Sequence, residues 1–420
     1  MNSPVLYRVT DRNMPPKMST EEIFQSIEGG LAPVLAEYSL TGKKIGILVG
    51  SRGIRSLQEI VTCLIQVLQT NGAEVVLLPA MGSHGGATAE GQQTILEEYG
   101  LGQKITGVPI LSCMDVTQVG DVDEHPVYVD SLVLGLDGVI PVNRIKAHTD
   151  FHGVYESGIA KMLVIGAGKR HQAEAVHQHG TKGLTDLIPK IAEIVLKKIP
   201  FLAAVAILEN KFDETALIEV LNKTNVLSRE QELLIQSKKM LPIIPFKDLD
   251  VLVVSQMGKN ISGVGMDPNI TKRMRIGGIE EEQGGPRRIV VLDLTEASSG
   301  NSLGMGIADV ITQKLYDKVD FKKTYINTIT SGFLERCFVP VVMPTEQEAI
   351  SVAIQTCGRI ATWETARMVF IYNTLEMAEF FISAPLLTEL PTHYIAEKTA
   401  APKIFDDLGA LTLKWSKLPT

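Results

Sequence analysis

Apolar residues in the first part of the chain alternate between strand-like runs and helical stripes. Residues 43–51 (KKIGILVGS) are a short apolar run that predicts a buried strand. Residues 56–73 place apolar side chains three and four positions apart, which predicts a helix opened by Ser56 and stopped by Asn71 and Gly72. The strand EVVLLPA and a helix from about Thr88 follow. Two strand–helix units in succession predict parallel strands joined by right-handed crossovers.

Similar patterns run through the rest of the chain. Residues 137–146 predict another buried strand, 213–239 are mostly charged and predict helix, and the two prolines of 241–248 suggest a linker. A second block is predicted to contain the strands DVLVVSQMG, RRIVVLDLT, RMVFIYNT and ALTLKW, with helices near 302–316 and 346–357. We therefore expect an α/β protein of two domains, residues 1–243 and 244–420, with mainly parallel sheets and an active-site cleft between them.

Composition narrows the class of protein. A hydrophobic content of 45% with 21% charged residues is ordinary for a globular protein. The net charge of −8 argues against a nucleic-acid binder, which would carry a basic patch. No signal-peptide pattern opens the chain and no apolar run is long enough to span a membrane. Four cysteines without paired spacing indicate free thiols. We expect a cytoplasmic protein with no membrane or nucleic-acid partner.

Candidate chemistry is concentrated between Pro141 and Gly180. This stretch holds five of the eight histidines of the chain, with lysines and glycines between them. It begins on the strand predicted over 137–146, so its histidines are expected at the carboxyl edge of the sheet, where open α/β sheets bind ligands. The loops GSRGIR and GSHGGAT, which follow the two earlier strands, are expected at the same edge.

The two glycine-containing loops offer further candidates. In GSHGGAT, Gly82 and Gly85 let the backbone approach a cofactor closely, and His84 stands where a catalytic group is often found. The alternative is a tight turn with an incidental histidine. In GSRGIR, we expect one of Arg52 and Arg55 to meet a phosphate or carboxylate while the other is a surface charge.

The histidine-rich stretch contains three kinds of candidate. His148 and His152 are candidate general bases, because the unperturbed pKa of a histidine lies near neutrality, although either can equally be a hydrogen-bonded structural histidine. Lys161 lies among small and apolar residues, and a buried lysine is costly unless it is paired or used covalently. An imidazole of His177 or His179 can bind a metal, but their spacing fixes no site, and two positions apart on a helix only one faces it.

Two further motifs bear on phosphate and substrate binding. GAGKR, at 166–170, lacks the GxxxxGK[ST] spacing of a phosphate-binding loop, so we reject a nucleoside triphosphatase. Gln256 and Lys259 follow a predicted strand among glycines in the second block. They are candidate substrate-binding groups, with an ordinary polar loop as the alternative.

Several of these motifs together resemble the nickel-dependent lactate racemase family. GSHGGAT, KAH followed by a glycine-rich turn, Lys161, His177 sixteen residues on, and QMGK at the start of the second block occur in the family's order and approximate spacing. The resemblance covers roughly residues 45–259, the rest only in outline, and it indicates a divergent member.

The resemblance implies a cofactor and a reaction. Members of the family use a nickel-pincer nucleotide, a pyridinium mononucleotide that holds nickel between two sulfur atoms and a ring carbon and that other proteins synthesise. By position, Lys161 would tether it through a thioamide and His177 would add a nickel ligand. His84 and His148 would exchange the hydroxyl proton of a 2-hydroxy acid while hydride moves to the cofactor. The protein is thus expected to be an isomerase, a racemase or epimerase of a 2-hydroxy acid.

The match also departs from the family in two places. The family's aspartate-threonine-arginine-proline loop is replaced by GSRGIR, so Arg52 or Arg55 would have to make its contacts. The segment between His148 and Lys161 is longer and contains His152, which would share or replace the acid–base role. A substrate larger than lactate fits this change. By position, the Q-x-x-K pair of the second block would hold the substrate carboxylate or hydroxyl.

Two other functions use the same residues. A zinc- or iron-dependent lyase or hydrolase would need no organic cofactor and would leave Lys161 unmodified. A non-catalytic protein that binds an anionic metabolite would bind a hydroxy acid without turning it over.

Overall fold

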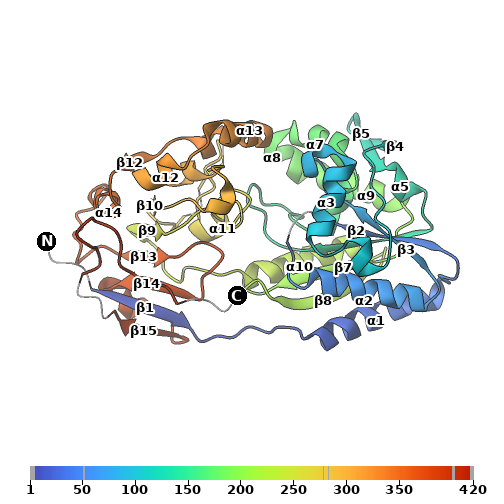
Figure 1. Cartoon of the computed structure of the whole chain (residues 1–420), viewed down its shortest axis with the longest axis horizontal. Coiled ribbons are helices and arrows are strands. Elements are labelled where there is room, and N and C mark those ends of the chain that lie inside the picture. The colour runs from blue at the N-terminus through green and yellow to red at the C-terminus, as the bar shows by residue number, and fades with distance from the viewer. Residues whose placement is uncertain (1–4, 51–52, 278, 282, 400–402, 417–420) are drawn as a thin grey trace. The chain divides into compact units, whose positions relative to one another are not determined.

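The structure is a computed structural model that describes residues 5–50, 53–277, 279–281, 283–399 and 403–416. The chain divides into two compact units (Figure 1). Pro15–Leu241 form the first, and the chain from Pro242 onward forms the second together with the N-terminal strand. The predicted α/β fold with mainly parallel sheets is confirmed. Among the described residues, no helix combines the length and the apolar character needed to cross a membrane.

The first unit contains one five-stranded sheet and a two-stranded hairpin among its described residues, with helices around them. In chain order its elements are α1 (Thr20–Glu37), β2 (Lys44–Val49), α2 (Leu57–Thr70), β3 (Glu74–Pro79), η1 (Gly85–Ala87), α3 (Ala89–Glu98), α4 (Gln103–Thr106), β4 (Val116–Val122), β5 (His125–Asp130), α5 (Ser131–Leu134), β6 (Gly138–Arg144), α6 (Ile159–Lys161), η2 (Met162–Gly166), α7 (Lys169–His177), α8 (Gly180–Lys182), η3 (Gly183–Leu187), α9 (Ile188–Lys198), β7 (Ala204–Glu209), β8 (Thr215–Leu221) and α10 (Val226–Met240).

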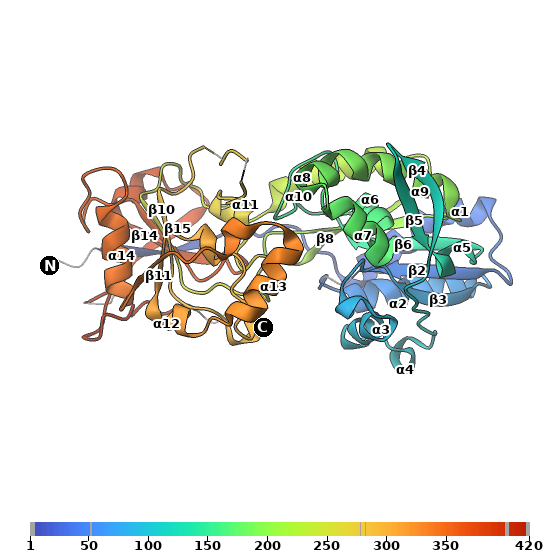
Figure 2. The same ribbon diagram turned by 90° about the horizontal axis from the view of Figure 1, so that it is seen from above.

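The sheet of the first unit has the strand order β3-β2-β6-β7-β8. Its first four strands are parallel, as predicted for the strand–helix units, and β8 runs antiparallel to β7. Alternate strand residues face two separate cores, because helices cover both faces of the sheet. Helices α1 and α2 pack together against one core, while α9 and the β4–β5 hairpin pack together at the other (Figure 2).

Local sequence explains the helix ends, with one correction. Helix α2 ends as predicted, with Asn71 at its cap and Gly72 in the left-handed region at φ +86°. Thr88 caps α3 by accepting from the Gly91 backbone N–H. The predicted capping by Ser56 is wrong, because this residue adopts φ +57° and its side chain makes no cap hydrogen bond.

The second unit is built on an eight-stranded sheet in its described residues. In chain order its elements are β1 (Leu6–Asp11), β9 (Val251–Val254), α11 (Pro268–Thr271), β10 (Arg288–Val291), η4 (Glu296–Ser298), η5 (Met305–Ile307), β11 (Val310–Thr312), α12 (Gln313–Asp317), α13 (Phe321–Ser331), η6 (Leu334–Cys337), β12 (Val341–Met343), α14 (Glu346–Gln355), β13 (Met368–Ile371), β14 (Glu379–Ser383), η7 (Ala384–Glu389) and β15 (Tyr394–Lys398).

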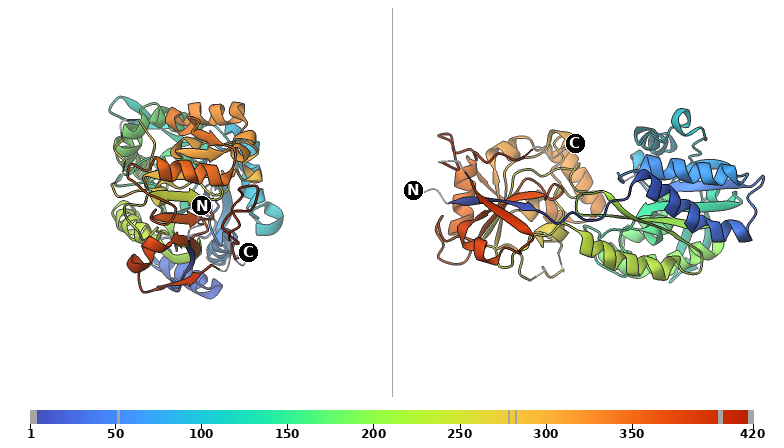
Figure 3. Two further views of the ribbon diagram at one scale, coloured as in Figure 1. Left: turned by 90° about the vertical axis from the view of Figure 1, so that its left-hand side faces the viewer. Right: turned by 90° about the horizontal axis from the view of Figure 1, so that it is seen from below.

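The order of this sheet is β12-β11-β10-β9-β13-β14-β1-β15. The five strands from β12 to β13 are parallel, and β14, β1 and β15 add antiparallel neighbours. Strand β1 therefore belongs to the second unit, and Figure 3 shows it in blue among the orange-to-red strands. This pairing was not predicted, because the partners of β1 lie more than 360 residues further along the chain.

Three predicted elements differ from the structure. The stretch 213–239 contains strand β8 before α10, and 302–316 contains strand β11, so neither is one continuous helix. The predicted last strand, ALTLKW, forms only an isolated bridge between Leu411 and Phe405. The four cysteines are free, as predicted, although only Cys357 is buried.

Candidate active site

The predicted site residues of the first unit lie on segments that leave the carboxyl edge of its parallel sheet. The turn after β3 carries His84, and the loop after β6 carries His148 and His152. Lys161 ends the short helix α6 and leads directly into the π-helix η2. Single π-helical turns are rare in proteins, but those that occur often lie at functional sites. The segment around Lys161 is therefore a candidate part of an active site.

Lys161 and His148 form the centre of this group. The Nζ atom of Lys161 is in hydrogen-bond contact with Nε2 of His148. The Asp150 backbone N–H donates to Nδ1 of His148 at 3.0 Å, so in the neutral ring the proton sits on Nε2 and points at Lys161. A hydrogen bond in that direction needs an uncharged amine, the nucleophilic form of lysine.

His177, at the end of α7, lies in the same electrostatic environment. Surrounding protein desolvates its ring, which lowers its pKa. A charge on Lys161, when that amine is protonated, acts in the same direction, and nearby Asp150 opposes both effects. The residue as a whole is nevertheless exposed, so solvent weakens this desolvation. A lowered pKa favours the neutral imidazole, which is the form that binds metals. His179 instead stacks against His125 with 4.4 Å between ring centroids, so the two histidines do face different surroundings.

Glu156 holds the loop that carries His148 and His152. Its buried carboxylate accepts the His148 backbone N–H at 2.6 Å and pairs with Lys238 at 2.6 Å. The ring of His152 lies 3.3 Å from it. The His152 side chain is 49% exposed. Desolvation would raise the pKa of Glu156, but hydrogen bonds from His152, Lys238 and the His148 backbone outweigh it and lower the pKa.

The Glu156→Gln variant should be less stable, by about 1–3 kcal/mol at neutral pH, because a buried acceptor network loses its charge. The folded pKa lies below the ordinary value of 4.5, so this contribution is present above pH 4.5 and is lost as the pH falls through the folded pKa. Thermal unfolding from pH 3 to pH 7 should show the wild-type advantage shrinking below pH 4.5. Glu174→Gln, which removes a surface pair with Arg170, serves as the neutral control. A difference that stays constant over this range would contradict the assignment.

Glu230 on α10 supports the turn that ends in Lys161. Its Oε2 atom accepts the Ala160 backbone N–H at 2.8 Å, and its Oε1 atom has no hydrogen-bond partner among the described residues. The residue is buried, and a Cβ at Gly158 would come within 2.0 Å of Oε1. Burial raises the pKa of Glu230 to about 8, against the opposing effect of the backbone N–H groups. The Glu230 side chain, mostly protonated at neutral pH, thus contacts Ala160, the residue before Lys161.

The His84 turn is shaped by glycines that serve its own packing. Gly82 and Gly85 have φ of +61° and +64°, and a Cβ at Gly85 would lie 2.6 Å from the backbone of Gly91 in α3. The Gly82 N–H donates to the carbonyl of Gly166 at 3.2 Å. The turn with the exposed His84 is therefore tied to the π-helix that follows Lys161.

The arginines of GSRGIR are only partly placed. Arg52 lies outside the described residues. The Arg55 backbone N–H donates to Glu209 at 2.7 Å, and Glu209 also pairs with Arg144 at the end of β6. The exposed Arg55 side chain lies near Glu214, whose pKa is lowered mainly by a hydrogen bond from Lys17 and in part by Arg55.

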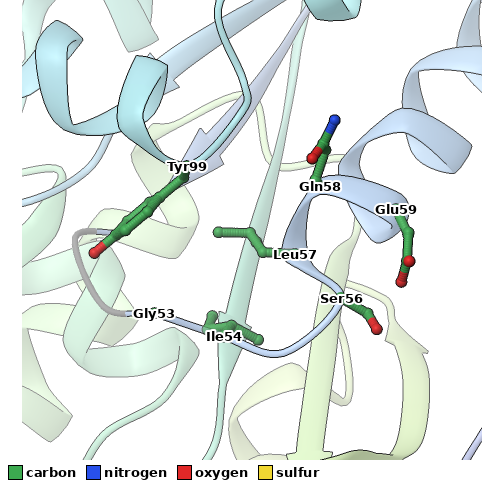
Figure 4. A pocket seen from close by; sticks show the side chains of 7 residues that line it. All are labelled: Gly53, Ile54, Ser56, Leu57, Gln58, Glu59 and Tyr99. Carbon is green, nitrogen blue, oxygen red and sulfur yellow. The ribbon is translucent and has the colours of Figure 1, made fainter. Parts of the chain in front are cut away.

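A pocket lies beside the start of α2 and is lined in part by Gly53 and Ile54 of the GSRGIR loop. Figure 4 shows the ring of Tyr99 reaching toward the loop that precedes this helix. Its lining residues are Gly53, Ile54, Ser56, Leu57, Gln58, Glu59 and Tyr99. They include none of the candidate residues described above.

Gln256 and Lys259 follow β9 in the second unit. The Lys259 Nζ atom donates to the carbonyl of Gly263 and, at 2.8 Å, to Oδ1 of Asn327 on α13. Gln256 is half-buried, and its backbone N–H donates to the Tyr372 carbonyl. Their roles toward a substrate stay predictions.

Sequence reasoning missed the two supporting carboxylates. Glu230 could have been noticed in the sequence. It lies on the apolar face of α10 with Val226, Leu233 and Leu234, at a position where an amphipathic helix normally carries a hydrophobic residue. Glu156 left none, because its partners converge from one loop and from Lys238, 82 positions further on.

No group of three or more His, Cys, Asp or Glu side chains placed to hold a metal ion occurs within the described ranges.

No protein-family model matches the sequence, and no curated protein matches it. Several solved structures share its fold, and two of them are the following. The lactate racemase apoprotein from Thermoanaerobacterium thermosaccharolyticum is 13% identical, with a TM-score of 0.54 over 87% of this chain and 94% of its own. A structural-genomics protein from Thermotoga maritima is 12% identical, with a TM-score of 0.54 over 87% of this chain and 99% of its own. The chain therefore has a lactate-racemase-like α/β fold.

Proposed function

We propose that this protein is a racemase or epimerase of a 2-hydroxy acid that works by reversible hydride transfer through a nickel-pincer nucleotide tethered to Lys161. The observation that carries the proposal is the contact between the Lys161 amine and the His148 imidazole, with His177 in the same electrostatic environment. The lactate-racemase-like fold and the motif resemblance support it.

The side chains fit such a cofactor. An uncharged Lys161 amine is the form that can be acylated or thioacylated, and the neutral imidazole of His177 can give one ligand to nickel. A nickel ion that brings its own sulfur and carbon ligands takes only one imidazole from the chain, so it needs no cluster of protein ligands. When bound, this group would accept hydride from the substrate carbon and return it.

The remaining chemistry belongs to the chain. His148 and His84 would take the proton from the substrate hydroxyl and give it back, a role that imidazole side chains commonly fill. The Asp150 backbone N–H fixes the tautomer of His148, and Glu156 fixes its loop. His152, which pairs with Glu156, is the alternative acid–base residue. Gln256 and Lys259 are the proposed groups for the substrate carboxylate or hydroxyl, and Gly82, Gly85 and an arginine of GSRGIR for the cofactor.

The test is the intact mass of protein co-expressed with the enzymes that make the cofactor, with nickel counted in the same sample. We expect a mass increment and about one nickel per chain, with the increment lost in Lys161→Ala and nickel strongly reduced in His177→Ala. His179→Ala is the matched control, because His179 stacks on His125 instead, and it should retain both.

The opposite result separates the alternatives. An unmodified mass without nickel, from a host that loads the lactate racemase, would overturn the proposal. Turnover that needs a metal but no organic cofactor would then indicate a lyase or hydrolase. Binding of a hydroxy acid without turnover would indicate a metabolite-binding protein.

A further inference from the structure

The lysine of the GAGKR motif is buried without any role in the proposed chemistry. Lys169 is 0% exposed and pairs with Asp130 at 3.1 Å, itself buried. Its backbone adopts φ +53° at the start of α7, a conformation that costs a non-glycine residue about 1 kcal/mol or more. A buried ion pair of this kind does not by itself indicate a gain in stability, because a protein with apolar side chains of similar size in its place is often equally or more stable. The role of Lys169 is therefore better explained by the other hydrogen bonds that its ammonium group donates.

Lys169 connects strand β3 and helix α3 to the turn that carries His84. Its Nζ atom donates to the carbonyl of Pro79, the last residue of β3, at 2.7 Å and to Oε1 of Gln92 on α3 at 3.1 Å. The buried Gln92 amide donates in turn to the carbonyls of Gly82 at 2.9 Å and His84 at 3.3 Å.

The Gln92 amide is held in one orientation from both sides, by the ammonium of Lys169 and by the two turn carbonyls. An ammonium group only donates, so the amide oxygen must face Lys169 and the amide NH₂ must face the turn. With an apolar residue at position 169, the buried amide oxygen of Gln92 would lose this donor, while the two turn carbonyls, which only accept, would still face the amide NH₂. The same lysine begins the helix that ends at His177, so one buried charge links the segments that carry both histidines.

We propose that Lys169 is a positioning residue that, through Gln92, fixes the backbone of the His84 turn and so the placement of the His84 imidazole. His84 is an acid–base group only under the proposed function, but the positioning itself is a property of the chain alone. It can therefore be tested without cofactor.

The first test is hydrogen exchange of the cofactor-free protein, read for residues 81–88. Gln92→Met keeps the side-chain length but cannot donate to the two carbonyls, and we expect these amides to exchange at least tenfold faster. Asp130→Asn/Lys169→Met removes the ion pair as a unit, so no buried charge is left alone, and should give the same local effect. Gln93→Met is the matched control, because Gln93 is the exposed neighbour of Gln92 and its side-chain amide donates to Glu97 on the surface of the same helix. Unchanged exchange in both variants, or a uniform rise across the first unit, would overturn the proposal.

The second test uses loaded enzyme. Gln92→Met should lower kcat at least tenfold with KM within about twofold, because placement of an acid–base group affects the reaction step more than substrate binding. A variant with faster local exchange but wild-type kcat would also overturn it. If no loaded form racemises any hydroxy acid, the proposed function fails, while the exchange result still decides the role of Lys169.

Discussion

Replacing His148 with alanine in loaded enzyme is expected to lower kcat by about a hundredfold or more, the usual contribution of a positioned general acid or base. His148 contacts Lys161 directly and has its tautomer fixed by the Asp150 backbone. The same loss is expected for His84→Ala if the two histidines work on the proton from different sides. Steady-state kinetics with a panel of 2-hydroxy acids and sugar acids measures both, and nickel content must be determined for each variant to separate catalysis from cofactor loss.

His152→Ala is the informative comparison. Its ring is half-exposed and bound to Glu156, so we expect less than a tenfold loss in kcat. A severe loss in His152→Ala together with a mild one in His148→Ala would exchange the two roles. Equal mild losses in all three variants would contradict acid–base catalysis by histidine.

The parallel core of each unit was predictable because its strands carry their own signal. Strands β2, β3 and β6 are short runs of buried apolar residues, which few other structures produce. β8 was missed because TALIEVL has only every third residue fully buried and carries a glutamate. β11 has three residues, too few for any periodicity to appear. β1 depends on partners near the other end of the chain, which local pattern cannot reveal.

The reactive groups of the candidate site could be proposed from the sequence, but their supporting groups could not. Histidines and an apolar-flanked lysine are conspicuous, so Lys161, His148 and His177 could be singled out. Their supporting groups look ordinary in sequence: Glu230 acts 70 positions away from Ala160, and Gln92 bonds Lys169 over 77 positions. Such groups are defined by burial and by hydrogen-bond direction, which exist only in the folded chain.

Replacing Glu230 with glutamine is expected to remove a pH dependence of stability worth a few kcal/mol. The folded pKa of about 8 lies above the ordinary value of 4.5, so the folded chain binds this proton more tightly than the unfolded chain does. The free energy of unfolding of the wild type should therefore fall as the pH rises from about 4.5 to about 8. The amide of Glu230→Gln resembles the protonated acid and still accepts from Ala160, so the variant should match the wild type near pH 5 and exceed it at pH 8.

Urea denaturation between pH 5 and pH 8.5, followed by circular dichroism, measures this difference. Both tryptophans, Trp363 and Trp415, lie in the second unit, so fluorescence follows that unit separately and should show no effect of the substitution. Glu232→Gln, on the same helix but with a 65% exposed carboxylate, should leave the pH slope unchanged.

If the slope of unfolding free energy against pH persists in Glu230→Gln, the Glu230 carboxyl ionises normally. If Glu230→Leu then also retains a covalently modified Lys161 after loading, the carboxyl has no part in holding the Lys161 turn. Loss of modification in Glu230→Leu but not in Glu230→Gln would show that the acceptor for the Ala160 N–H, rather than the charge, keeps that turn in place.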